Sequence, residues 1–179
     1  MIADPQAQIS DFTEMTDEEL GLLIGSFFRA IGWGAVAGSG FFLVFTVPAS
    51  VIALAGEGDP RVLLFGLLPL LIGLAGSLSG MIVIGLPLTA LLRHMQRERA
   101  AIYTATGTLG GFAIPLLCVG WFEGEFNSGI LGTGLFLGLF GAIAGGVTAK
   151  IWGRYRESLA HIPAEPEEPT ANPYHEMIY

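Results

Sequence analysis

The charged side chains that could bind a ligand or take part in chemistry gather mainly in one basic and one acidic cluster. The basic cluster follows the ends of two long apolar stretches. It consists of Arg93, His94, Arg97, Arg99, Lys150, Arg154 and Arg156. Beside a membrane, such a cluster binds anionic lipid headgroups at about 1 kcal/mol per basic residue. The sequence therefore predicts a headgroup-binding rim formed by Arg93, Arg97, Arg99, Lys150, Arg154 and Arg156.

The acidic cluster lies in two short loops and consists of Glu57, Asp59, Glu123 and Glu125. Hard cations prefer several oxygen ligands, so these carboxylates are candidates for weak cation binding. Solvated loop residues explain the same pattern equally well. We therefore predict no metal site here.

Residues suited to nucleophilic or redox catalysis are sparse. Cys118 is the single cysteine and lies in an apolar run, which excludes an intrachain disulfide and CxxC redox chemistry. His161 and His175 are isolated in an acidic C-terminal segment. The long apolar stretches contain no carboxylate and no histidine, which argues against proton antiport and haem binding. We expect neither an enzyme nor a cofactor.

The composition indicates that these residues are positioned by membrane-spanning helices. The 179 residues are 52% hydrophobic and 13% charged, with a mean hydropathy of +0.62. A bilayer core of about 30 Å needs about 20 apolar residues. Four stretches qualify, at about 31–55, 62–92, 101–122 and 129–152. The predicted fold is an all-α membrane protein with one bundle of four transmembrane helices over residues 31–156.

A short amphipathic helix is expected before the first span, over residues 16–30. Thr16 and Glu19 match a capping box, and the apolar residues from Leu20 to Ile31 follow one helical stripe. We predict that this helix lies in the membrane interface and bends near Gly32; the alternative is one continuous helix protruding into the cytoplasm. Residues 1–15 and 157–179 are acidic and are expected to be disordered.

The spans carry rows of small residues at intervals of four. In lipid, helices associate mainly through close van der Waals approach and hydrogen bonds, which small residues permit. The candidate helix-packing residues are Gly34, Gly38, Gly73, Ser77, Gly76, Gly80, Gly107, Gly111, Gly134, Gly138, Ala142 and Gly146. These rows pack the bundle internally, or the row in the fourth span faces another subunit.

The basic residues also predict an orientation. Six of them follow the second and fourth spans, whereas only Arg61 lies on the opposite side. By the positive-inside rule, both termini are expected in the cytoplasm and the protein in the cell (inner) membrane. The expected neighbours are the lipid bilayer with its anionic headgroups, and a homo-oligomer or larger membrane complex. The charge distribution shows no nucleic-acid footprint.

Two functions remain open at this stage. The first is a non-enzymatic accessory, assembly or self-associating subunit that works through helix packing. The second is a channel or facilitator for a small solute, formed by an oligomer, in which a weakly polar path is lined by Thr104, Thr106, Thr108 and Ser77 or Ser79. We expect solute flux in liposomes to support the second, and co-purification with a larger complex to support the first.

Overall fold

The computed structural model describes residues 17–95, 97–123 and 128–160, and these residues form helices joined by short turns. The elements are α2 (Asp17–Glu57), α3 (Arg61–Gly80), the π-helix η1 (Met81–Gly85), α4 (Leu86–His94), α5 (Ala100–Glu123) and α6 (Ser128–Ala160). Four helical segments are long and apolar enough to cross a membrane, with α3, η1 and α4 together forming the second. The predicted all-α fold with four transmembrane helices is confirmed. Of the two segments expected to be disordered, residues 1–15 and 161–179 lie outside the described residues, whereas residues 157–160 form the end of α6, so the prediction is wrong there.

The separate amphipathic helix does not appear, and this part of the prediction is wrong. Helix α2 runs without interruption through 41 residues, about 60 Å, and Gly32 produces no break. Packing explains the continuity: Ala30, Ile31 and Ala35 are buried, and the Phe27 ring meets that of Trp152 on α6 at a centroid distance of 5.9 Å. Because α6 contacts α2 on both sides of Gly32, at Phe27 and at Gly34, the helix continues through this position. Thr16 of the capping box lies outside the described residues.

The second span is interrupted by the π-helical turn η1. The Leu86 N–H donates to the carbonyl of Met81, five residues earlier. Pro87 follows directly and has no N–H with which to continue the regular α-helical pattern. Such wide turns occur mostly as single insertions in α-helices and are frequent at functional sites. The irregularity therefore has a local cause in the sequence, and it divides this span into α3 and α4.

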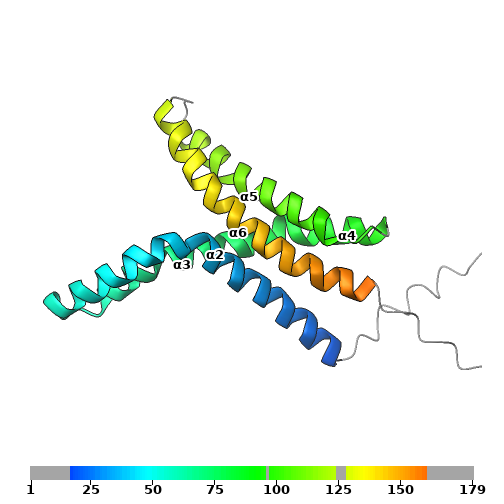
Figure 1. The fold of residues 1–179 in the computed structure, drawn as a ribbon, viewed down its shortest axis with the longest axis horizontal. Helices are drawn as coiled ribbons and strands as arrows, with labels where there is room; N and C mark the ends of the chain where they lie inside the picture. Colours follow the sequence, from blue (N-terminus) through cyan, green and yellow to red (C-terminus); the bar gives the residue numbers. More distant parts are fainter. Residues whose placement is uncertain (1–16, 96, 124–127, 161–179) are drawn as a thin grey trace, which may run out of the picture.

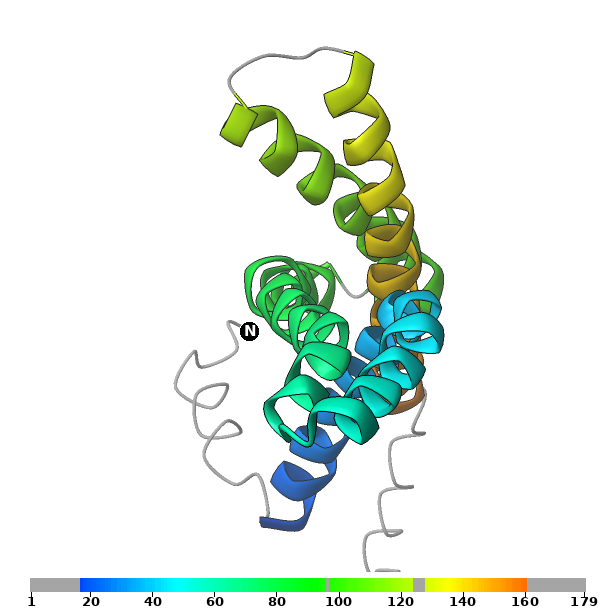
Figure 2. The same ribbon diagram turned by 90° about the vertical axis from the view of Figure 1, so that its left-hand side faces the viewer.

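The helices form two arms that diverge from a common end (Figure 1). One arm contains α3 packed along the C-terminal half of α2, and the other contains α5 packed along α6. The N-terminal half of α2 also packs on α6, which joins the arms. Figure 2 shows the same separation from the side, with the end of α5 and the start of α6 far from the turn between α2 and α3. The described chain thus has the shape of a V.

The closed base of the V contains the main cluster of buried side chains. It consists of Ala30, Ile31, Met81, Leu92, Tyr103 and Trp152. The predicted headgroup-binding rim lies at this same end, which we call the arginine-rich end. It consists of Arg93, Arg97 and Arg99 at and after the end of α4, and Lys150, Arg154 and Arg156 near the end of α6. Toward the two opposite connections, large apolar side chains such as Phe65 and Leu117 are exposed. Packing is therefore concentrated at one end of the molecule.

Candidate functional site

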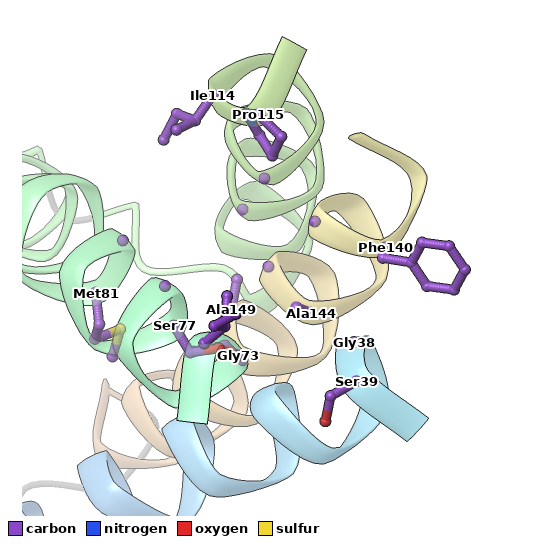
Figure 3. Close-up of a pocket in the computed structure, with 18 of the residues that line it drawn as sticks. Gly38, Ser39, Gly73, Ser77, Met81, Ile114, Pro115, Phe140, Ala144 and Ala149 are labelled. Carbon is purple, nitrogen blue, oxygen red and sulfur yellow. The ribbon is translucent and has the colours of Figure 1, made fainter. Parts of the chain in front are cut away.

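An apolar cavity of about 550 Å³ lies where the two arms meet (Figure 3). The second span forms one wall, α5 and α6 form the other, and α2 contributes Gly38, Ser39 and Phe42. None of the described residues that line the cavity is charged. Pockets of about 300–1,000 Å³ with apolar walls and a few polar groups are typical binding sites for small molecules. The cavity is therefore the candidate functional site.

The wall contributed by the second span lacks side chains at two positions. A Cβ atom built on Gly76 or Gly80 would have no neighbour within 4 Å, although both residues line the cavity. In the following turn, the Met81 side chain folds over Gly85, where a Cβ would lie 2.6 Å from its sulfur. The bare glycines and the π-turn keep this side of the cavity open.

Four hydroxyl-bearing residues belong to the cavity lining, and three of them, besides Ser39 on α2, come from three other helices. Ser77 lies on α3, Tyr103 on α5 and Thr148 on α6. Each hydroxyl oxygen is enclosed, and none has a hydrogen-bond partner in the described structure. Tyr103 is 1% exposed and Thr148 is 5% exposed. A buried polar group without a hydrogen bond costs about 1–3 kcal/mol, and because these oxygens are enclosed by neighbouring atoms, with that of Thr148 against Gly34 of α2, they are not open to the cavity.

The cavity ends at a hydrogen-bonded contact between α6 and the second span. The Trp152 indole N–H donates to the Thr89 hydroxyl oxygen at 2.9 Å. The Thr89 hydroxyl in turn donates to the carbonyl of Gly85 at 2.8 Å, at the end of the π-turn. This relay fixes α6 against η1 and α4. Trp152 is only 3% exposed, so its ring forms a dry floor for the cavity.

An ion pair lies just beyond this floor. Arg156 donates to the Glu98 carboxylate at 2.7 Å, and their side chains are only 12% and 8% exposed. The Arg156 Nε–H has no acceptor in the described structure. The next residue, Glu157, accepts a long hydrogen bond of 3.4 Å from the Ala100 N–H at the start of α5. Together these contacts tie the segment between α4 and α5 to the end of α6.

The six residues of the predicted headgroup-binding rim divide into two groups. Arg156 is turned inward and pairs with Glu98, so it is not an exposed cation. The other five are exposed at the arginine-rich end: Arg93, Arg97, Arg99, Lys150 and Arg154. Arg97 and Arg99 flank a small hollow next to Ile102. The geometry therefore leaves five exposed cations around the base of the V.

The structure brings several of the predicted packing glycines into close contact. The backbones of Gly107 and Gly145 meet, as do those of Gly111 and Gly141, so that α5 and α6 touch without intervening side chains. Gly34 on α2 lies against the Thr148 side chain of α6, with its hydroxyl oxygen closest. A Cβ at any of these positions would overlap atoms of the neighbouring helix.

The remaining predicted packing residues differ in their surroundings. Those with a neighbour from another helix are Gly38 against Ala144, Gly73 against Ala35, Gly134 against Leu116, Gly138 against Phe112, and Gly146 against Thr108. The row of the fourth span, which includes Ala142, thus faces α5 and not a free surface. Gly76 and Gly80 have no such neighbour, and Ser77 lies beside them in the cavity wall.

Sequence reasoning missed the residues that close the base of the V. Tyr103 and Trp152 lie near the ends of predicted spans, where aromatic residues commonly face the membrane interface, yet both are buried. Thr89 gave no signal, because hydroxyls are common within apolar helices. Glu98 did give a sequence signal. It is the single acidic residue between Arg97 and Arg99, and an acid in a basic segment suggests a specific cationic partner.

The acidic cluster is only partly described. Glu125 lies outside the described residues, as do His161 and His175, and the Glu57 and Glu123 side chains are not described. The Asp59 carboxylate accepts a hydrogen bond from the Arg61 N–H at 2.9 Å, within the turn where Gly58 adopts a φ of 71°. Among the described residues, no group of three or more His, Cys, Asp or Glu side chains could hold a metal.

The fold and the cavity define a multi-pass membrane protein with four spans. No protein-family model, curated protein or solved structure is significantly similar to this chain. Functional conclusions therefore depend on the geometry of the chain itself.

Proposed function

We propose that this chain is a non-enzymatic membrane subunit that associates with a transmembrane helix of another polypeptide, which enters the cleft between the two arms. One observation carries the proposal: the arms diverge, and the cavity between them is a cleft with exposed apolar side chains on both walls. On the α3 side, Leu68 and Ile72 are 47% and 64% exposed; on the opposite arm, Ile114 and Leu137 are 43% and 39% exposed.

The small residues on α3 support a helix as the occupant. The unpacked glycines Gly76 and Gly80 remove bulk from one wall, so an entering helix could approach the α3 backbone closely. Close approach is the main source of helix association in lipid, where apolar surface alone provides little drive. The glycine rows on α5 and α6 are already used within the chain, which leaves α3 as the wall with free small residues.

The exposed cations support an orientation in which the arginine-rich end faces the cytoplasm, with both chain termini on that side of the cell membrane. In this orientation Arg97 and Arg99 would meet the anionic headgroups of the inner leaflet. The test is a cysteine introduced at Asn127, in a background without Cys118. We expect an impermeant reagent to label it from outside intact cells; labelling only after permeabilisation would reverse the orientation.

The association itself is tested by gentle isolation from native membranes and mass measurement. We expect a discrete complex heavier than one chain. Ile72→Trp should remove this complex because the indole narrows the cleft. Leu71→Trp is the matched control, since Leu71 is 52% exposed on the same helix but does not line the cavity. A single chain alone, or equal loss with both variants, would contradict the proposal.

The alternative function, a solute facilitator, has less support. The Thr104 and Thr108 hydroxyls donate to their own helix, at the carbonyls of Ala100 and Thr104, both at 2.8 Å. They are therefore already satisfied by the backbone. Of the residues expected along a polar path, Ser77 is the one that lines the cavity. Solute flux through the purified protein in liposomes would favour the facilitator.

A further inference from the structure

The segment between α4 and α5 carries three charged residues in a row, Arg97, Glu98 and Arg99, which divide between two sides of the chain. The Glu98 side chain is only 8% exposed and pairs with Arg156 of α6 at 2.7 Å. Arg97 and Arg99 are exposed and line one hollow together with Ile102. Holding the acid inward therefore leaves its two basic neighbours together on the outer side.

Backbone hydrogen bonds fix the segment on both sides of Glu98. The Arg97 N–H donates to the Leu92 carbonyl at 3.1 Å, which ties the segment to α4. The Arg99 carbonyl accepts from the Ile102 N–H at 3.0 Å, in the first turn of α5. The end of α4 and the start of α5 lie on the same side of the molecule as the end of α6 (Figure 1). Both arginines thus extend from an ordered backbone, which lowers the entropic cost when they bind one ligand.

The two guanidinium groups in the hollow have no protein partner in the part of the chain that the structure describes. The acids closest in the sequence and across α6 are engaged elsewhere. Glu98 pairs with Arg156, and Glu157 accepts from the Ala100 N–H at 3.4 Å. The hollow is therefore positively charged, and its donors are available to an anion.

The lining favours a lipid phosphate over a soluble anion. Guanidinium groups bind phosphate through paired, charge-assisted hydrogen bonds whose fork geometry matches the phosphate oxygens. The third lining residue, Ile102, is half-buried and lies at the start of the apolar helix α5. It places apolar surface beside the two cations, as at the boundary between headgroups and acyl chains. A free anion gains nothing from that surface, whereas a phospholipid covers it.

We propose that Arg97 and Arg99 form a discrete site for the phosphate of one anionic phospholipid, with the adjoining part of the lipid against Ile102 and with Glu98 as the positioning residue. The inference deepens the proposed function and rests on it for the placement of the arginine-rich end at the inner leaflet. It differs from general attraction to an anionic surface, to which every exposed cation contributes alike.

The test counts the lipids bound to the full chain in a neutral detergent by native mass spectrometry. Phosphatidylglycerol is the anionic probe, and phosphatidylcholine with the same acyl chains is the comparison, because its choline cation opposes the two arginines. We expect the first phosphatidylglycerol to bind at least about tenfold more tightly than phosphatidylcholine, and later copies to show no such preference. Inorganic phosphate in large excess should not displace the first lipid.

Three substitutions of exposed arginines distinguish a discrete site from diffuse attraction. Arg97→Gln and Arg99→Gln should each weaken binding of the first phosphatidylglycerol about tenfold, because each removes charge-assisted hydrogen bonds. Arg154→Gln is the matched control, since Arg154 is exposed at the same end but does not line the hollow. It should change the affinity less than about twofold, because solvent screens an exposed charge outside the site.

Two substitutions of Glu98 test its positioning role. Both Glu98→Gln and Glu98→Ala remove a negative charge beside the two arginines, so attraction by charge alone would tighten binding in both. Glutamine keeps a side-chain oxygen for Arg156, and we expect binding to be retained or tighter. Alanine removes the inward anchor, and we expect binding about fivefold weaker. Circular dichroism of both variants separates loss of the fold from loss of binding.

Three results would overturn the inference. Equal weakening by Arg154→Gln would mean that the cations act as a diffuse surface. Displacement of the lipid by inorganic phosphate would mean that the site takes a soluble anion. Tighter binding in Glu98→Ala, or equal loss in both Glu98 variants, would mean that the acid does not position the arginines. All these measurements use the isolated chain in micelles, so their failure is distinguishable from the absence of a native complex or a reversed orientation.

Discussion

The α5–α6 arm and the second span use glycine in opposite ways. Along α5 and α6, Gly107 meets Gly145 and Gly111 meets Gly141, so the two backbones are in contact. Along α3, Gly76 and Gly80 have the same four-residue spacing but no neighbour within 4 Å. One arrangement brings helices together, and the other leaves space. The comparison teaches that small residues at this spacing permit close approach without requiring it.

The largest expected loss of stability comes from placing a side chain in the backbone contact between α5 and α6. Gly111→Leu places a side chain where the Gly141 carbonyl lies, and backbone atoms cannot move aside as a flexible side chain can. We expect the free energy of unfolding to fall by more than about 3 kcal/mol. Reversible unfolding in mixed detergent micelles measures the change.

Gly132→Leu serves as the control for Gly111→Leu, because a Cβ at Gly132 has no neighbour within 4 Å and the residue lies on the same arm. It should change stability little. Equal destabilisation by the two variants would mean that the close approach of α5 and α6 does not determine the stability of this arm.

A somewhat smaller effect is expected from Glu98→Ala, which tests how the base of the V is held. The substitution leaves Arg156 without its carboxylate while 12% of the arginine side chain is exposed. Removing one partner of a buried pair is strongly destabilising, and partial access to solvent reduces the penalty, so we expect about 3 kcal/mol at most. Glu98→Leu combined with Arg156→Leu should be more stable than Glu98→Ala alone. If the double variant is instead the less stable one, the cost does not come from an unpaired charge.

Thr89→Val tests the hydrogen-bonded link between the second span and α6. It removes both the acceptor of the Trp152 N–H and the donor to the Gly85 carbonyl while keeping the shape of the side chain. We expect a loss of about 1–2 kcal/mol and faster amide exchange in η1. Unchanged exchange over residues 81–85 would show that the relay does not hold the π-turn. Thr104→Val, whose hydroxyl bonds only within α5, provides the comparison.

The smallest expected change in stability comes from a substitution on α3, where Gly76 and Gly80 have no neighbour within 4 Å. Gly76→Leu adds a side chain where the structure has open space, so the free energy of unfolding should change by less than about 0.5 kcal/mol. The same unfolding experiment as for Gly111→Leu measures it. A loss close to that of Gly111→Leu would mean that α3 packs more tightly against α5 and α6 than the structure indicates.

The success of sequence reasoning differed between local and long-range features. The four spans followed from hydropathy, which is a property of each segment by itself. The continuity of α2 past Gly32 did not, because the contact of Phe27 with Trp152 joins residues far apart in the chain. Similarly, the basic residues indicated one end of the bundle, whereas the inward turn of Arg156 depended on Glu98 in the segment between α4 and α5.

By itself, the sequence determined that the chain forms four membrane-spanning helices and that its cations gather at one end, since apolar length and charge are properties of each segment. Only the tertiary structure decided which glycine rows contact a neighbouring helix and where an apolar cavity lies between the arms. The physical reason is that lipid gives no general drive for one apolar helix to pack on another. The arrangement therefore depends on specific contacts between distant segments. These contacts bring the backbones of α5 and α6 together and leave Gly76 and Gly80 of α3 without a neighbouring helix.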